Sequence, residues 1–301
     1  MKYRFMLLCL LGHAAYSQQV NSFFDAYIGT NAQGYLQPLA DMTITGLNTG
    51  IQPSIRIGDK FNVRLSLHTA HIFPDKSQKT FMADTPDSFD PKTTVEVPTI
   101  VGNASNVKVA GVNGTSYAFS GGYNITRLSW ATPQLSIGGF YGTDISLRFM
   151  TLGKTDTDFG KFNQIGVGLR HSVSQYFLKK DSPYVINIGY QFNKADIGRY
   201  IQLQSNYAYL QAGVTNKNIG FFAFGGYQMG TFDVSYTYKE DNTDKAQTVN
   251  LKNQFPVLLG IGTHIQLGFF SLTLGASGMK PLIAFGNIGF RFQSKTKQTK
   301  P

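Results

Sequence analysis

The sequence predicts an all-β fold, a transmembrane antiparallel β-barrel of about 12–14 strands preceded by a short helical segment. The first observation is that apolar and polar residues alternate with a period of two in many successive segments. The second is composition: 32 Gly, 24 Phe and 16 Tyr accompany only 15% charged residues, whereas soluble domains average about 25%. The third is that no apolar run after residue 17 approaches the ~18 residues of a membrane helix.

The final predicted strand, residues 282–292, shows the pattern most clearly. Its apolar face carries Leu282, Ile288, Phe290 and Phe292, and the opposite face carries small and polar residues. Lipid would cover the first face and a lumen would receive the second. A secreted β-sandwich is the alternative. It would expose more Lys and Glu on its polar faces, whereas these faces hold Gly, Ser, Asn, Gln and a few Arg.

Residues 1–17 read as a secretory signal peptide, with Lys2 and Arg4 before an apolar run and Ala15 before the expected cleavage after Ser17. Its removal takes away Cys9, the single cysteine, and two positive charges, so that a net charge of +10 becomes +8. The mature chain would lack disulfides and thiolate chemistry. For an exported basic protein we expect outer-membrane lipid and lipopolysaccharide as partners and no nucleic acid.

Residues 18–50 do not resemble a strand. Aromatic and apolar residues that include Tyr27, Tyr35 and Leu39 recur at helical spacing, but Pro38 and several glycines interrupt them. We expect short helical turns rather than one helix, which either plug the lumen or form a periplasmic lead-in.

The barrel is predicted over residues 51–292 and a basic tail over 293–301. Residues 51–57 and 61–68 form the first expected hairpin, and a long polar loop over residues 73–114 follows. Later alternating segments are predicted strands, and their order is 117–125, 135–137 (broken at Gly138 and Gly139), 144–149, 165–170, 184–192, 201–209, 219–227, 232–238, 257–267, 272–274 and 282–292.

Charged residues on the predicted inner faces are the candidate binding residues. They are Arg56, Arg64, His68, Asp144, Arg148, Arg170, Asp233, His264 and Arg291. One interpretation is a set of structural ion pairs that brace the wall. The other is a positively charged lumenal site for an anionic headgroup or a carboxylate, because guanidinium groups bind both in a bidentate manner. The predicted ligand-binding residues are Tyr27, Tyr35, Leu39, Arg56, Arg64, Arg148, Arg170 and His264.

The sequence carries no motif for catalysis, a metal or a cofactor, and we expect no enzyme. His171 and Ser172 are neighbours along one predicted strand, so their side chains point to opposite faces and cannot form a dyad. His68 and Ser66 share a face but lie in no signature motif.

Four segments resemble an uncharacterised family of Bacteroidota outer-membrane barrel proteins, a domain of unknown function. They are residues 35–40 (YLQPLA), 47–50 (LNTG), 72–75 (IFPD) and 98–102 (PTIVG). The resemblance implies a barrel in the outer membrane but no activity. A pre-barrel segment followed by a barrel is also similar in architecture to the long-chain fatty-acid porins, whose N-terminal segment plugs the lumen.

Two functions fit these observations. The first is passage or binding of a small hydrophobic or amphipathic ligand, with residues 18–50 as a plug. The second is a non-transporting outer-membrane scaffold, such as a component of secretion or surface assembly. A lipid-modifying enzyme is a third, weaker alternative. The sequence does not define the oligomeric state.

Overall fold

The computed structural model describes residues 27–50, 52, 54–153, 161–216, 218–240, 243–278 and 280–293. The predicted signal peptide and nearly all of the predicted basic tail lie outside these residues. None of the described helices is both long and apolar enough to cross a membrane.

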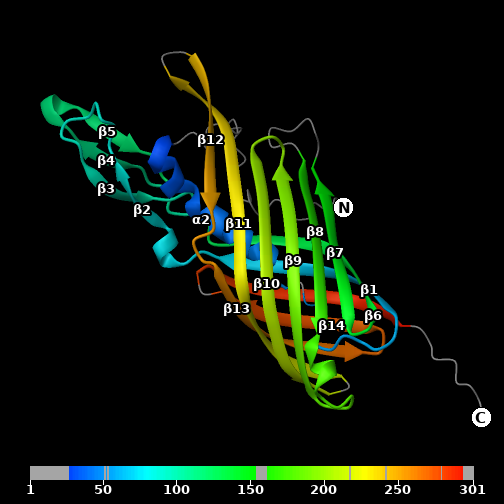
Figure 1. Cartoon of the computed structure of the whole chain (residues 1–301). Helices are drawn as coiled ribbons and strands as arrows, with labels where there is room; N and C mark the ends of the chain where they lie inside the picture. Colours follow the sequence, from blue (N-terminus) through cyan, green and yellow to red (C-terminus); the bar gives the residue numbers. More distant parts are fainter. Residues whose placement is uncertain are drawn as a thin grey trace, which may run out of the picture.

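The main sheet closes on itself into an antiparallel barrel (Figure 1). The eleven strands of the sheet follow the order β10-β9-β8-β7-β6-β1-β15-β14-β13-β11-β12, and β10 also pairs with β11. Since β12 pairs with β11 outside this ring, ten strands form the barrel. These ten are β1 (Asn62–Phe73), β6 (Leu128–Phe140), β7 (Thr143–Leu152), β8 (Phe162–Ser172), β9 (Tyr184–Ile197), β10 (Ile201–Thr215), β11 (Ile219–Glu240), β13 (Val257–Leu267), β14 (Phe270–Ser277) and β15 (Leu282–Gln293).

The predicted fold class is confirmed, but the predicted 12–14 strands are too many. Residues 54–57 are not a strand, and the first barrel strand begins at Asn62 instead of residue 51. Residues 116–119 pair in a hairpin outside the barrel, and the two strands predicted within 219–238 are one continuous strand, β11. Alternation reports a half-buried strand but not which sheet it joins, so the count from sequence was wrong.

The two ends of the barrel differ. At the end where β1 begins and β15 finishes, the connections include residues 141–142, 216–218 and 268–269, and we call this the turn end. At the opposite end, which we call the loop end, residues 74–127 connect β1 to β6. The connection at the turn end between β8 and β9 contains a short 3₁₀ helix, Val173–Tyr176.

The long connection forms a cap beside the loop end (Figure 1). It contains two hairpins and two 3₁₀ helices: η2 (Lys76–Gln78), β2 (Thr80–Asp84) paired with β3 (Thr94–Pro98), and β4 (Val107–Ala110), η3 (Val112–Gly114) and β5 (Ser116–Phe119). The strand β12 (Thr243–Lys252) extends the wall above the ring beside β11.

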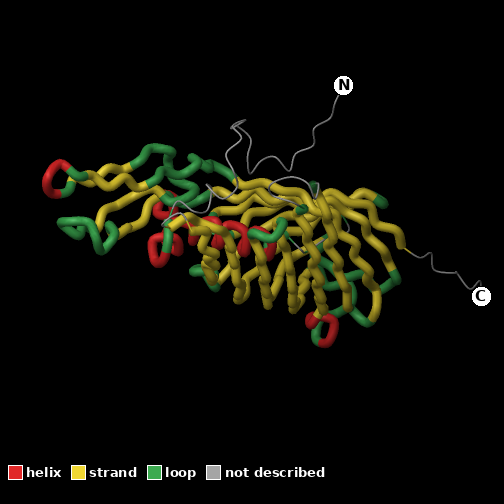
Figure 2. Tube along the Cα trace, turned by 90° about the horizontal axis from the view of Figure 1, so that it is seen from above, coloured by secondary structure: helices red, strands yellow, loops and turns green. Residues whose placement is uncertain are grey.

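One helix, α2 (Gly29–Asn48), runs from the cap into the barrel (Figures 1 and 2). The expectation of short helical turns is therefore wrong. Pro38 lies inside the helix, and Gly34 and Gly46 lie beneath the rings of Phe81 and Trp130, where an added Cβ would come within 2.3 and 2.2 Å of ring carbons. Burial on several sides stabilises a helix that intrinsic propensity disfavours, and the two glycines allow the close approach.

The outer face of β10 and β11 changes character along the barrel axis, whereas their inner face carries buried apolar or aromatic residues toward both ends. On the turn-end half of β10, Ala208 and Leu210 are exposed on the outside. On its loop-end half the outward residues are Gln202 and Gln204, and the apolar Ile201 and Leu203 point inward and are buried. On β11, Phe221, Tyr227 and Met229 are exposed on the outer face nearer the turn end. Its inner face is apolar toward both ends, with Phe222 and Phe224 buried near the turn end and Phe232, Val234 and Tyr236 buried near the loop end.

The structure corrects the faces predicted for β10 and for residues 232–238. The prediction placed their apolar residues toward lipid and Asp233 inward, but Asp233 lies on the outer face. Near the loop end the apolar residues cover α2 instead of contacting lipid. In contrast, β15 has the predicted orientation, with Leu282, Ile288, Phe290 and Phe292 exposed outside.

Candidate functional site: the occupied lumen

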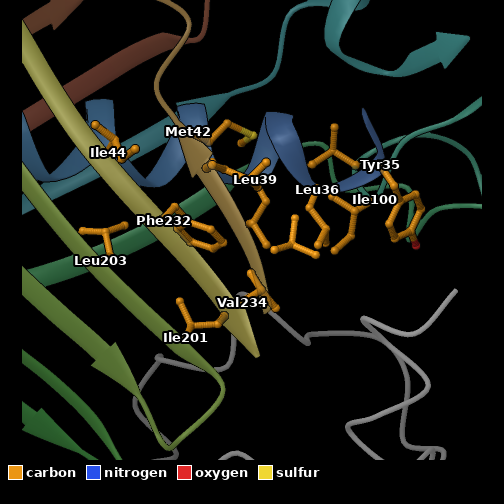
Figure 3. Packing of buried hydrophobic residues seen from close by; sticks show 14 of the residues in the cluster. Tyr35, Leu36, Leu39, Met42, Ile44, Ile100, Ile201, Leu203, Phe232 and Val234 are labelled. Atoms are coloured by element: carbon orange, nitrogen blue, oxygen red, sulfur yellow. The ribbon is translucent and has the colours of Figure 1, made fainter. Parts of the chain in front are cut away.

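The loop-end half of the lumen is an apolar core built on α2. Leu36 and Leu39 extend from the helix toward β11, the strand that carries Phe232 and Val234 (Figure 3). All four side chains are buried in one cluster that also includes residues of the cap. The helix is therefore packed between the wall and the cap.

The C-terminal carbonyl groups of α2 meet donors from the wall near the middle of the barrel. Arg148 on β7, 1% exposed, donates from Nη1 to the Leu47 carbonyl oxygen (3.1 Å) and from Nη2 to that of Thr49 (3.2 Å). Gln191 on β9 also donates to the Leu47 carbonyl (2.7 Å). A cation at this position compensates the negative end of the helix dipole.

Asn48, at the end of the helix, bonds to three strands at once. Its Oδ1 accepts hydrogen bonds from Asn193 on β9 (3.1 Å) and Ser205 on β10 (2.9 Å). Its Nδ2 donates to Gln228 Oε1 on β11 (3.0 Å). Buried polar groups need such partners, so this residue fixes the rotation and depth of the helix in the lumen.

The chain after the helix continues through the turn-end half of the lumen. Arg170 on β8 forms a buried ion pair with Asp144 and donates to the carbonyl of Ser54. Asn187 donates to the carbonyl of Ile55 (2.8 Å). Together with α2, this segment spans the lumen from the loop end to the turn end.

An apolar cavity remains between α2 and the wall, and we call it the helix–wall cavity. Its volume is about 70 Å³. Its lining residues are Thr43, Leu47, Leu128, Ser129, Trp130, Phe162, Ala195, Ile197, Ile201, Leu203 and Phe232. Within the described part of the chain, the buried indole Nε1 of Trp130 has no hydrogen-bond partner. A buried donor without an acceptor is costly, which makes this cavity a candidate ligand site.

The predicted binding residues fall into three places. Tyr27, Tyr35 and Leu39 are buried where α2 meets the cap, and burial raises the pKa of both tyrosines well above the ordinary value. The Tyr27 hydroxyl donates to the Ser120 carbonyl (2.7 Å) and that of Tyr35 to the Gly121 carbonyl (3.3 Å). These contacts place the two tyrosines in the cap interface and away from the helix–wall cavity.

The predicted arginines and His264 lie nearer the turn end. Arg64, Arg148, Arg170 and His264 are buried inside the barrel. Arg56 is exposed at the turn end, where it donates to the carbonyl of Ser182 in the connection between β8 and β9, so it is not buried inside the barrel as the other three arginines are. One of the expected ion pairs is present, Arg170 with Asp144.

Sequence reasoning missed the polar residues that hold the helix, namely Asn48, Gln191, Asn193 and Gln228, as well as Trp130. A useful signal was that Trp130 is the single tryptophan of the chain. His171 and Ser172 have separate partners, Thr143 and Ser174. Among the described residues, no three His, Cys, Asp or Glu side chains gather where they could hold a metal ion.

Asp41 is an acidic residue of α2 that is buried in the loop-end half of the lumen. It is 2% exposed, and its Oδ1 accepts hydrogen bonds from the backbone N–H of Gln254 (2.8 Å) and from Gln37 Nε2 (3.1 Å). Burial raises the pKa of Asp41 to about 6, although both hydrogen bonds act in the opposite direction. The charge of the helix therefore changes in a mildly acidic medium.

A family model described as "Family of unknown function (DUF6588)" matches residues 1–287. The chain belongs to this family. The expected membership of an unknown-function family is confirmed, and the Bacteroidota origin stays a prediction. No curated protein matches the sequence.

Several solved structures are similar at low scores. Ail, the attachment invasion locus protein of Yersinia pestis, shares 8% identity over 77% of this chain and 99% of its own, with a TM-score of 0.28. OprG of Pseudomonas aeruginosa shares 10% identity over 80% of this chain and 100% of its own, also at 0.28. The toluene transporter TodX of P. putida shares 10% identity over 90% of this chain and 73% of its own, at 0.25. TM-scores this low support no functional conclusion.

Proposed function

We propose that this protein is an outer-membrane β-barrel that its own N-terminal helix plugs, and that it binds a small apolar or amphipathic ligand in the helix–wall cavity. A closed barrel leaves no unpaired strand edge, which is the requirement for strands in a bilayer. The exposed apolar residues of the turn-end half, among them Leu147, Val167 and Ile261, would contact lipid. Lipopolysaccharide and other outer-membrane lipids are the proposed surroundings.

The observation that carries the ligand proposal is the apolar cavity with one unpartnered donor. Its lining is almost entirely apolar, and one of its lining residues, Trp130, has a buried indole N–H without a partner among the described residues. Binding sites for small molecules combine such apolar walls with a few polar groups. A volume of about 70 Å³ suits a ligand, or one end of a ligand, of a few non-hydrogen atoms.

The single tryptophan makes this proposal directly testable. We expect 1-bromopropane to quench Trp130 fluorescence in the refolded protein by heavy-atom contact. The quenching should saturate as the ligand concentration rises. Ala195→Phe fills the cavity and should abolish the saturable component. Ala208→Phe, on the lipid-facing side of β10, is the matched control and should keep it. Quenching that does not saturate, or that Ala195→Phe leaves unchanged, would contradict ligand binding.

Whether a ligand also passes through depends on movement of α2. The hydroxyl oxygens of Thr49 and Ser277 lie 3.1 Å apart, so cysteines at both positions could join the plug to the wall. Passage predicts brief conductance events of the full-length reduced double variant in a planar bilayer, and oxidation should abolish them. Thr49→Cys alone should not respond to oxidant. The absence of conductance events in both the reduced and the oxidised protein would limit the function to binding.

The alternative function is a non-transporting scaffold, and the cap favours it. The two hairpins of residues 74–127 project beside the loop end and pack against the N-terminal half of α2. Such a surface would suit a partner at the cell surface. Absence of both saturable quenching and conductance in a folded barrel would support this alternative. That the protein is no enzyme stays a prediction.

A further inference from the structure

A second, polar pocket lies at the turn end of the lumen, away from the helix–wall cavity. It is formed by β1, β6, β7, β15 and the segment that follows α2. Its lining residues are Ser54, Arg56, Ile57, Gly58, Asn62, Arg64, Ser136, Gly138, Asp144 and Arg291. Its volume is about 10 Å³, roughly the space of one water-sized sphere.

Two arginines face each other across this pocket. Arg64 on β1 is the direct partner of Arg291 on β15, and both lie on the inward face of their strands. Like charges that oppose each other directly across paired strands destabilise a sheet. Nothing in the hydrogen-bond pattern of the strands requires this pairing, since any inward polar residue could occupy either position.

Arg64 is also unlike the other buried arginines of the barrel. It is 3% exposed, and its Nε has no hydrogen-bond partner among the described residues. By contrast, Arg148 donates to three neutral acceptors, and Arg170 has the Asp144 carboxylate and further acceptors. A buried guanidinium without an acceptor is strongly unfavourable unless a ligand supplies one.

The charges around the pocket leave a positive excess. Three arginines, Arg56, Arg64 and Arg291, line it together with one carboxylate, Asp144. That carboxylate is already engaged by Arg170, and Arg56 donates to a backbone carbonyl outside the pocket. Among the described residues, neither the Arg64 nor the Arg291 guanidinium group has a hydrogen-bond acceptor, which leaves both open to one from outside this part of the chain.

We propose that this pocket binds a small anion, which bridges the guanidinium groups of Arg64 and Arg291. A monatomic anion such as chloride fits the volume, whereas a tetrahedral oxyanion needs more space. The bound anion converts a repulsive pair into a cross-strand link that closes β1 onto β15 at the turn end. This proposal does not depend on ligand binding in the helix–wall cavity.

The test measures thermal unfolding of the refolded full-length protein in a non-ionic detergent, in sodium chloride and in sodium gluconate at equal ionic strength. At chloride a hundredfold above Kd, we expect the wild-type midpoint to rise by roughly 5–10 °C over its value in gluconate. Arg64→Met should lose this difference, and in gluconate it should be at least as stable as wild type because the repulsion is gone. Arg127→Met, an exposed arginine near the loop end, should retain the full chloride effect.

Equal midpoints of the wild type in the two salts, or the same chloride effect in Arg64→Met, would overturn the proposal. If Arg64→Met fails to fold, the site is tested in the wild-type protein with bromide in place of chloride. Crystals grown in sodium bromide should show an anomalous scattering peak between Arg64 and Arg291, and its absence would refute the site.

Discussion

The change of the outer face from apolar residues in the turn-end half to polar residues nearer the loop end predicts where lipid surrounds the barrel, and one pair of substitutions tests it. Leu147 on β7 is 42% exposed on the outer face, and Gln204 on β10 is exposed on the same surface nearer the loop end. We consider arginine at each position. If lipid covers only the turn-end half, the two substitutions differ in cost although both side chains are exposed in the isolated chain.

The expected difference follows from the height of each residue above the turn end. A strand rises ~3.4 Å per residue and tilts by ~40°, which gives about 2.6 Å of barrel height per residue. Leu147 lies four residues from Thr143, the turn-end residue of β7, which is a height of about 10 Å. Gln204 lies eleven residues from Thr215, which is a height of about 29 Å. An apolar band ~25 Å tall therefore has Leu147 near its middle and Gln204 beyond its edge.

Arginine at the middle of the band costs about 2–4 kcal/mol, and near or beyond the edge about 0–1 kcal/mol. The assay is urea unfolding of each variant from lipid vesicles, since a detergent micelle adapts to the surface. We expect Leu147→Arg to lower the free energy of unfolding by that larger amount and Gln204→Arg to leave it nearly unchanged. Equal costs at the two positions would refute the assigned lipid boundary.

Three further predictions concern the plug. Arg148→Met removes a hydrogen-bond donor from the carbonyl of Thr49. We expect the free energy of unfolding in urea to fall by about 1–3 kcal/mol and conductance events to become more frequent. Unchanged values would show that Arg148 does not hold the helix. Gly46→Ala places a Cβ 2.2 Å from the Trp130 ring. The cost of overpacking, about 1–3 kcal/mol, should outweigh the ~1 kcal/mol gained in helix propensity, and Trp130 emission should shift to the red. Greater stability with unchanged emission would contradict this packing. Burial raises the pKa of Asp41 from 3.8 to about 6, so the native state keeps its proton longer than the unfolded chain, and stability should fall by ~3 kcal/mol as pH rises through this window. Asp41→Asn should remove that fall, and a wild-type urea midpoint that is constant from pH 4 to pH 7 would disprove the shift.

The last strand, β15, shows how much the alternation of apolar and polar residues predicts about the faces of a strand. The alternation over residues 282–292 correctly gave the outer face of β15, whose apolar residues are exposed, and the inner polar residues Asn287 and Arg291 nearer the turn end. Near the loop end the inner face instead carries the buried apolar residues Ile283 and Phe285. For β10 the alternation correctly predicted a repeat of two residues, but the face that it assigned to lipid points into the barrel. The pattern reports that two faces differ, and only the neighbouring structure decides which one is covered by protein.

The sequence by itself determined the strand-rich fold, the low charge of the wall and a distinct pre-barrel segment, because these depend on composition and on a period of two. Tertiary structure alone decided that Gly29–Asn48 is one helix inside the lumen, since its glycines and Pro38 are tolerated only where Phe81, Trp130 and the wall enclose it. It also decided the register that sets Arg64 opposite Arg291. Such contacts join residues far apart in the chain, and their free energies depend on barrel closure, which no local stretch of sequence encodes.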